Sequence, residues 1–346
     1  MNRSAAVIAA AAVLLALFAG LAVYEYAAFG WHFAREEVPG TSAWHWLRTL
    51  LIALASLGLI ASLSRMPIAE RSTAEVGVRA TLLAYGIALL AVGATLVLVA
   101  DPPLYQRITN EDSAVEWGTA LALFLACGFM ALRQRQLVRE PIGTPWRWLH
   151  VLFGLGFIAL FFLMGMEEVS WFQRQIGFAT PASVAAENWQ GEFNLHNLQT
   201  DVTEFALYSA TGVFLMLLPL VRERLATWPL VVPVLPLLPD RTVAALSAPM
   251  LVFTYGHWDL PPVQAAFWTG LFACILFARS AGARGERLMW SLLAALVALG
   301  QFVHLAFGHT MIAIFDSTEY REFFISIGLA AYGWRQWRHG ERLTQT

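Results

Sequence analysis

Two adjacent carboxylates, Glu167 and Glu168, open the longest stretch of the sequence that is not apolar enough to cross a bilayer, residues 167–201. The same stretch contains Glu192 and His196, which would share one face of a helix at a spacing of four residues. Carboxylates and imidazoles transfer protons and bind divalent metals. A loop of this length with several aromatic residues favours an ordered, functional segment over a linker. We expect it to form the wall or lid of a site.

Further acids and histidines lie close to the ends of apolar runs. Glu116 follows Asp112 by one helical turn, and Asp316, Glu319 and Glu322 repeat every three residues at the start of the last run. Oxygen ligands with one or two imidazoles suit Mg, Mn, Ca, Fe or Zn. We therefore predict a divalent metal ion with ligands among His196, Glu116, Glu111, Asp112, His257 and His309. The predicted catalytic acids or bases are Glu167, Glu168 and Glu192.

Each of these assignments has a simpler structural alternative. Carboxylates at a helix end near water are common, and His257 beside Trp258 fits the aromatic belt of a membrane interface. Glu116 and Glu204 are harder to explain in this way, because each lies a turn inside an apolar run, where an unpaired carboxylate is costly. No His-Glu-x-x-His or Gly-x-Ser-x-Gly motif supplies a known mechanism.

The elements that must position these residues are membrane helices. The chain has 346 residues, of which 58% are hydrophobic and 13% charged, which is typical of an integral membrane protein. We predict an all-α, polytopic bundle forming a single integral membrane domain over 1–346. Its ten expected spans cover 5–28, 47–64, 79–100, 113–132, 148–167, 202–221, 241–256, 263–279, 287–307 and 321–337.

Three features qualify this helical pattern. The first run is too long for a signal-peptide core, so we expect an uncleaved helix. Prolines break up residues 228–239, which we predict to be a re-entrant or interfacial segment. Cys127 and Cys274 lie inside apolar runs, so we expect two buried thiols. The composition gives no indication of nucleic-acid binding.

The arginines predict the orientation of the bundle. With the N-terminus in the cytoplasm and ten spans, 17 of the 22 arginines lie on the cytoplasmic side, as the positive-inside rule requires. Both termini are then cytoplasmic, in a bacterial inner membrane. By the same assignment, 17 of the 24 acidic residues and six of the eight histidines lie at or near the outer face. Because acidic residues have little influence on topology, this asymmetry indicates a function.

Three motifs resemble those of an uncharacterised family of multi-pass bacterial membrane proteins. They are EDxxVEW at 111–117, EExSWxQRxxGF at 167–178 and GExNLHN at 191–197. The resemblance implies a membrane fold and no activity. Glu116-Trp117-x-Thr119 is also similar to a helix start in membrane-embedded metal hydrolases of the alkaline ceramidase type, although the chain lacks their paired His-x-x-x-His.

Three functions remain open at this point. The first is a metal-dependent hydrolase or transferase that acts on a lipid or lipid-linked substrate at the outer face of the membrane. The second is a cation- or proton-coupled transporter with the acids in its vestibule, and the third is a non-catalytic scaffold of the cell envelope.

Overall fold

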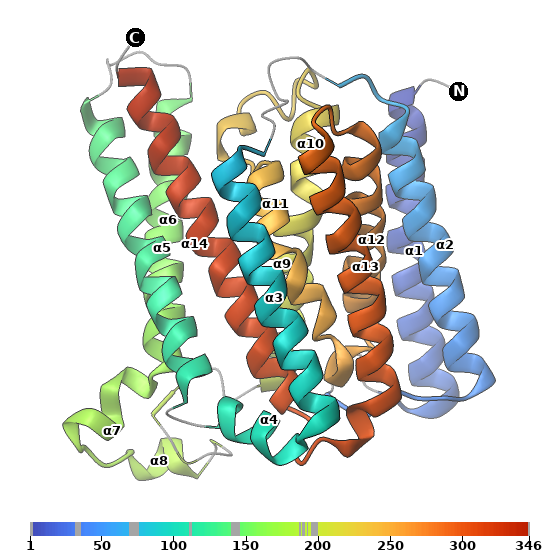
Figure 1. Cartoon of the computed structure of the whole chain (residues 1–346), viewed down its shortest axis with the longest axis vertical. Helices are drawn as coiled ribbons and strands as arrows, with labels where there is room; N and C mark the ends of the chain where they lie inside the picture. The colour runs from blue at the N-terminus through green and yellow to red at the C-terminus, as the bar shows by residue number, and fades with distance from the viewer. Residues whose placement is uncertain are drawn as a thin grey trace.

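The computed structural model describes residues 3–31, 36–68, 76–110, 113–139, 146–186, 188, 191, 193–194 and 200–344. Every regular element within these residues is a helix, as predicted, and none of them is a strand. The long helices run side by side between the two ends of the bundle (Figure 1).

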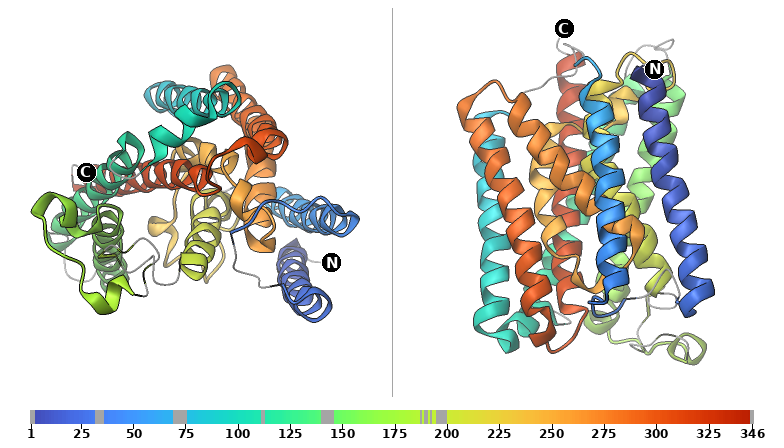
Figure 2. Two further views of the ribbon diagram at one scale, coloured as in Figure 1. Left: turned by 90° about the horizontal axis from the view of Figure 1, so that it is seen from below. Right: turned by 90° about the vertical axis from the view of Figure 1, so that its right-hand side faces the viewer.

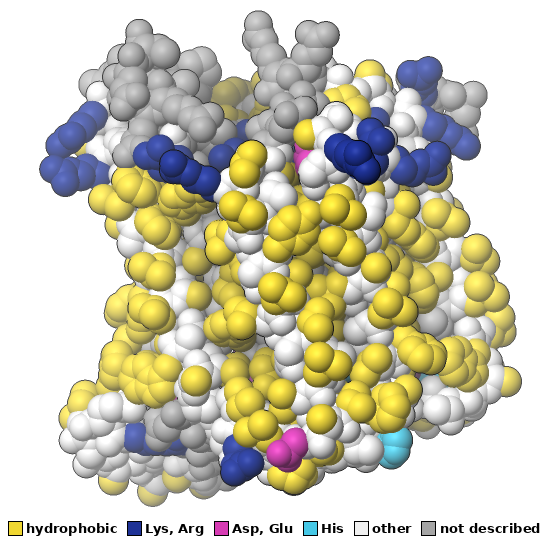
Figure 3. Space-filling model, viewed as in Figure 1, with side chains coloured by type: hydrophobic (Ala, Val, Ile, Leu, Met, Phe, Trp, Pro, Cys, Tyr) yellow, Lys and Arg dark blue, Asp and Glu magenta, His cyan; other side chains and the backbone are white. Residues whose placement is uncertain are grey.

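Eight helical runs among the described residues are long and apolar enough to cross a membrane. They correspond to eight of the ten expected spans. Their helices are α1 (Arg3–Phe29), α2 (Ala43–Ser64), α3 (Val78–Ala100), α4 (Pro102–Thr109) with α5 (Ala114–Arg139), α6 (Arg147–Glu168), α9 (Thr200–Gly212) with α10 (Leu218–Arg224), α12 (Pro261–Ser280) and α13 (Arg284–Phe307). A π-helical turn, Val213–Leu217, joins α9 to α10. Apolar side chains cover the middle of the bundle surface (Figure 3).

The helix expected over 241–256 is shorter than predicted. It consists of α11 (Arg241–Ser247), followed by two 3-10 turns, Ala248–Val252 and Tyr255–His257. Pro249 lacks the N–H that an α-helix would need there. Every residue from 241 to 260 is buried. Irregular backbone at membrane depth is tolerated when other helices surround it, which explains why this segment is interior.

The last helix, α14 (Asp316–Thr344), is longer than the expected 321–337. Its first two turns carry Glu319, Arg321 and Glu322, so its composition is too polar to count among the eight apolar runs. It packs mainly against α5 and α11 (Figures 1 and 2). Such a polar helix start is stable inside the bundle only if neighbouring helices supply polar partners.

The two ends of the bundle differ in charge. The start of α1 and the end of α14 lie at the same end, uppermost in Figure 1, and arginines gather there in Figure 3. We call this the arginine end. The opposite end, which we call the acid end, carries the loop before α2, α4, the short helices α7 (Gln173–Ile176) and α8 (Ala182–Ala185), and the start of α14.

The proline-rich segment 228–239 forms successive turns with one 3-10 turn, Leu235–Leu237. Its carbonyl oxygens are satisfied by side chains of the bundle. Arg222 Nη1 donates to the carbonyls of Leu235 and Leu238, at 2.9 and 2.5 Å, and Tyr332 Oη donates to that of Leu237 at 2.8 Å. The prolines thus prevent a helix, and α10 and α14 hold the resulting turns.

Candidate functional site

Seven glutamates approach one another at the acid end, and we call them the glutamate cluster. They are Glu36, Glu116, Glu167, Glu168, Glu204, Glu319 and Glu322. Helices α5, α6, α9 and α14 supply six of them, and the loop before α2 supplies Glu36. The Glu168 carboxylate interacts electrostatically with Glu322 and Glu319, as Glu36 does with Glu204. Glu204 is buried and the other six are half-buried, and carboxylates withdrawn from water in such number need protons, cations or hydrogen-bond donors.

A sharp reversal of the chain positions Glu167 and Glu168, the last two residues of α6. Ser170, Trp171 and Phe172 follow them with φ angles of 43°, 56° and 58°. Three consecutive non-glycine residues in the left-handed region are strained, a feature that clusters at functional sites. The turn brings the Trp171 indole back over α6, where Nε1 donates to Glu167 Oε1 at 2.7 Å.

The described part of the 167–201 loop is ordered by side-chain amides. Gln173 Oε1 accepts from the Phe193 backbone N–H at 2.7 Å. Asn188 Nδ2 donates to Asn194 Oδ1 at 2.7 Å, and Asn194 Nδ2 donates to Ser170 Oγ at 3.2 Å. These contacts tie the described residues 188, 193 and 194 to the turn after α6.

A buried histidine–glutamate pair joins the interior segment to α9. The Nε2 atom of His257 lies 3.0 Å from Glu204 Oε2, and the two residues are 1% and 8% exposed. Because an ionised carboxylate can only accept, the imidazole donates its Nε2–H to Glu204 Oε2.

Glu36 reaches the glutamate cluster from the loop before α2. Its Oε1 accepts a hydrogen bond from Thr318 Oγ1 at 2.6 Å, and its backbone N–H donates to Asp201 Oδ1 at 3.3 Å. Burial, followed by the nearby charge of Glu204, raises the pKa of Glu36 to about 7. A carboxyl group with this pKa can both give and take a proton at neutral pH.

Arg321 and Tyr208 lie beside these acids. Tyr208 Oη donates to Glu322 Oε1 at 2.6 Å, and the Arg321 guanidinium lies over the Tyr208 ring at 4.2 Å from its centroid. Arg321 is 1% exposed. The site thus holds one buried cation among several carboxylates.

A partly open cavity of about 920 Å³ leads from the side of the bundle to these acids. We call it the groove. Its α6 and α9 walls are mostly apolar, and exposed Leu160, Leu163 and Val213 place its mouth on the lateral surface. Four members of the glutamate cluster line it: Glu167, Glu168, Glu204 and Glu322. An apolar channel therefore meets an acidic end.

The predicted site residues are only partly brought together. Glu116, Glu167 and Glu168 join the glutamate cluster, and His257 joins it through Glu204. His309 is exposed in a 3-10 turn, Gly308–Thr310, and contacts no other described predicted ligand. The remaining four predicted residues lie outside the described residues: Glu111, Asp112, Glu192 and His196.

The described residues do not form a metal site by themselves. No three His, Cys, Asp or Glu side chains in the described part of the chain are arranged to hold an ion. Of the three acids spaced three residues apart at the start of α14, Glu319 and Glu322 join the glutamate cluster. Asp316 accepts instead from Thr109 Oγ1 and the Ala313 N–H. Arg321 lies within Glu319-Tyr320-Arg321-Glu322, a stretch that shares the family resemblance, whereas Tyr208 had no signal in the sequence that marked it as a site residue.

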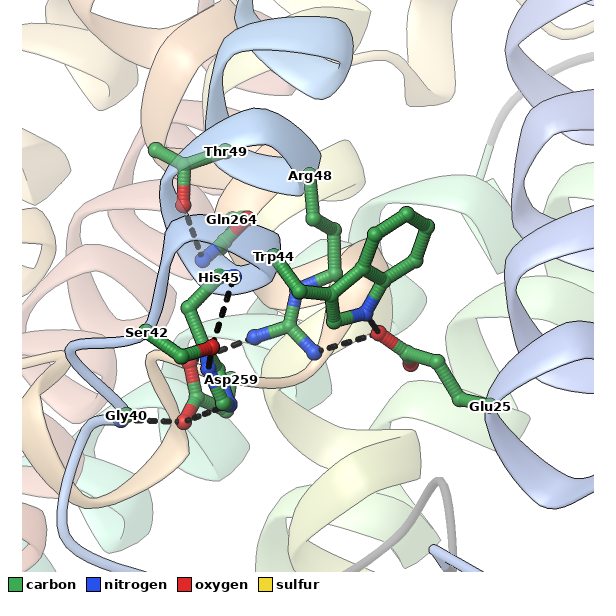
Figure 4. Close-up of polar contacts among 9 residues, drawn as sticks. All are labelled: Glu25, Gly40, Ser42, Trp44, His45, Arg48, Thr49, Asp259 and Gln264. Atoms are coloured by element: carbon green, nitrogen blue, oxygen red, sulfur yellow. Dashed lines mark hydrogen bonds and ion pairs between the residues drawn. The ribbon is translucent and has the colours of Figure 1, made fainter. Parts of the chain in front are cut away.

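A second polar group, the Arg48 network, supports the loop that carries Glu36 (Figure 4). Arg48 on α2 donates from Nη1 to Glu25 Oε1 on α1 at 2.8 Å and from Nη2 to Asp259 Oδ1 at 2.5 Å. Asp259 Oδ2 also accepts from the Gly40 N–H at 2.6 Å. Trp44 Nε1 donates to Glu25 at 2.9 Å. The network joins α1, α2 and the segment before α12.

A scan against protein-family models, a search of curated proteins and a search of solved structures each found no match.

Proposed function

We propose that this protein is an integral membrane enzyme that hydrolyses or transfers a group on a lipid or lipid-linked substrate. The observation that carries the proposal is the groove, whose apolar walls end at Glu167, Glu168, Glu204 and Glu322. The hydrocarbon chain of a lipid gains little free energy when it moves from the bilayer into the groove, because the bilayer interior is already apolar. The groove would instead orient the substrate and hold its head group against the acids.

Glu168 is the best candidate for the catalytic acid or base. It lines the groove, and it has no hydrogen-bond partner among the described residues, whereas Glu204 and Glu322 are bonded to His257 and Tyr208. Its carboxyl group is therefore available to a substrate atom. Glu36 would exchange the proton with Glu168 through the glutamate cluster, since its pKa is about 7.

A divalent metal ion remains part of the proposal. Glu319 and Glu322 would supply carboxylate oxygens, and the predicted ligand His196, which lies outside the described residues, would be a further ligand. Such an ion would lower the pKa of bound water toward about 7 and make it a nucleophile. Elemental analysis of the purified protein would detect it.

The proposal places the acid end outside a bacterial cytoplasmic membrane, with ten crossings. The arginine end would face the cytoplasm under the positive-inside rule. The two crossings beyond the eight apolar runs would be α14 and the segment 241–260. Two ion pairs support a crossing by the segment 241–260. Before it, Asp240 pairs with Arg335 near the end of α14, and at its other end Asp259 pairs with Arg48 near the start of α2.

The test is conversion of lipids by the purified protein. It would be incubated with a polar lipid extract in uncharged detergent, and products would be followed by mass spectrometry. We expect wild type and the exposed neighbour variant Glu37→Gln to form the same product. Glu168→Gln keeps the size of the side chain but not its basicity, so its rate should fall by about 10²–10⁴. An unchanged lipid profile with wild type, or full activity of Glu168→Gln, would refute the proposal.

A transporter is the second candidate, because the buried segment 241–260 is an interrupted helix. Transporters use interrupted helices to form binding sites near the middle of the membrane. The described acids gather at one end instead. Proton or cation flux in reconstituted vesicles that is lost in Glu168→Gln, without any lipid product, would favour this function.

A further inference from the structure

Three aromatic rings meet at the inner end of the groove, and we call them the aromatic floor: Phe157 on α6, Phe214 on the π-helical turn and Tyr332 on α14. The ring centroid of Phe157 lies 5.6 Å from that of Phe214 and 5.3 Å from that of Tyr332, and the last two are 4.9 Å apart. Phe157 and Phe214 line the groove, as Leu218 does at the same end, and Tyr332 is fully buried. On α6, which the structure describes throughout, no residue before Phe157 lines the groove. The rings therefore separate the groove from the half of the bundle nearer the arginine end.

The floor lies at the same depth on all three walls. Each ring is ten or eleven positions from the glutamate that its own helical run supplies to the groove. The pairs are Phe157 and Glu168, Phe214 and Glu204, and Tyr332 and Glu322. At a rise of roughly 1.5 Å per residue, the groove is about 15 Å deep. The hydrocarbon core of a bilayer is about 30 Å thick, so one leaflet contributes about 15 Å. The groove thus has the depth of one leaflet.

Contacts with the rest of the bundle hold the floor in place. Tyr332 Oη donates to the Leu237 carbonyl of the proline-rich segment at 2.8 Å. Phe161, which is fully buried, stacks on Phe157 with the ring centroids 5.5 Å apart. Close-packed side chains resist the insertion of further atoms, because a displaced ring must leave its preferred rotamer. The rings therefore form a firm stop at the end of the groove.

We propose that the aromatic floor sets the length of the hydrocarbon chain that the groove accepts. The occupant is one lipid chain from the leaflet at the acid end, with its head group at the acids and its terminal methyl group at Phe157 and Phe214. A shorter chain leaves part of the apolar lining without contacts, and a longer one must displace the rings or leave through the lateral mouth. One methylene too many in a close-fitting apolar pocket weakens binding of the transition state by about tenfold or more.

This inference rests on the proposed function and specifies its substrate class. The substrate is a lipid with an ordinary acyl or alkyl chain about as long as one leaflet. An isoprenoid carrier chain is much longer and would have to leave the groove through its mouth. Phe157 and Phe214 would then make the enzyme selective among lipids that share a head group.

Photoreactive lipids test the inference on the purified protein in an uncharged maltoside detergent. The probes are monoacyl phosphatidylcholines with a diazirine at the end of the chain, in a series from decanoyl to octadecanoyl. Cross-linked residues are identified by mass spectrometry of peptides. We expect the label on Phe157 and Phe214 to be strongest for one chain length and about tenfold or more weaker for the next longer probe. Shorter probes should label residues nearer the acids, such as Leu160 and Leu207.

A variant that opens the floor should change this profile. Phe157→Ala removes one ring, so the strongest label in the groove should move to a longer probe. Phe153→Ala is the matched control and should keep the wild-type profile, because Phe153 lies on the same helix, is exposed and does not line the groove. If Phe157→Ala does not fold, Phe157→Leu takes its place, since it shortens the side chain without emptying the position.

Two results in wild type overturn the inference: equal labelling of the floor by every chain length, or no label in the groove with any probe. A wild-type profile in the folded Phe157 variant also overturns it. The lipid-conversion assay with Glu168→Gln reports separately on the proposed function. If a product that depends on Glu168 still forms, the function stands and the floor takes no part in selection. Length-dependent labelling without any lipid product keeps the groove as a chain-binding site and overturns the function.

Discussion

Three carboxylates at the acid end each accept a hydrogen bond from a different neighbour. Glu167 accepts from the Trp171 indole, Glu204 from His257 and Glu322 from Tyr208. The Trp171 indole and the Tyr208 hydroxyl are neutral donors, so they solvate Glu167 and Glu322 without cancelling their charge. A site built in this way keeps its negative potential for a proton or a cation, which is the state that acid–base chemistry requires.

Glu36 makes stability depend on pH. Its pKa is raised from 4.5 to about 7, so between these values the folded chain keeps a proton that the unfolded chain loses. Stability therefore falls as pH rises through this window and is constant above it. Glu36→Gln removes the effect. We expect the free energy of unfolding of this variant to be close to that of wild type near about pH 4.5. Near about pH 8 it should be higher than that of wild type by up to about 3 kcal/mol.

Thermal unfolding in detergent across this pH range would measure the difference. The exposed neighbour substitution Glu37→Gln is the control and should follow wild type at every pH. If the stability of Glu36→Gln differed from that of wild type by the same amount at every pH in this range, Glu36 would be ionised throughout and solvated in the folded protein.

At the scale of elements, most helices could be predicted because lipid-facing helices are apolar along their whole length. The two departures have physical reasons. Pro249 interrupts the helix expected over 241–256, and hydropathy alone does not distinguish a regular helix from irregular backbone that other helices bury. The start of α14 was missed because Asp316 and Glu319 lower its hydropathy, although neighbouring helices bury this part of the chain.

The Arg48 network is expected to hold α1 against α2. Arg48 is 1% exposed and pairs with Glu25 and Asp259, so truncating it leaves two buried carboxylates without their cation. Removal of one partner from a buried ion pair costs about 3–5 kcal/mol. Arg48→Met should therefore lower the melting temperature by several degrees, whereas Arg107→Met at the exposed surface of α4 should leave it unchanged. Equal melting temperatures for the two variants would assign the network no stabilising role.

At the scale of the whole molecule, the site combines residues that no local pattern connects. Thr318 and Glu36 are 282 positions apart, Tyr208 and Glu322 are 114 apart, and Glu204 and His257 are 53 apart. Charge asymmetry along the chain indicated which end would hold the acids. It could not indicate which acids meet, because this depends on how α5, α6, α9 and α14 pack together.

The same asymmetry makes a prediction about the molecule in its membrane. Positive loops are retained in the cytoplasm, and the arginine end carries both the start of α1 and the end of α14. Reporter tags at the two termini should therefore both indicate cytoplasm. A tag inserted within Thr180–Ala186, around α8 at the acid end, should indicate the outer side. Insertion there leaves the long helices intact, so loss of expression is not expected. If the terminal tags report the outside, the glutamate cluster faces the cytoplasm, and its substrate must come from the inner leaflet.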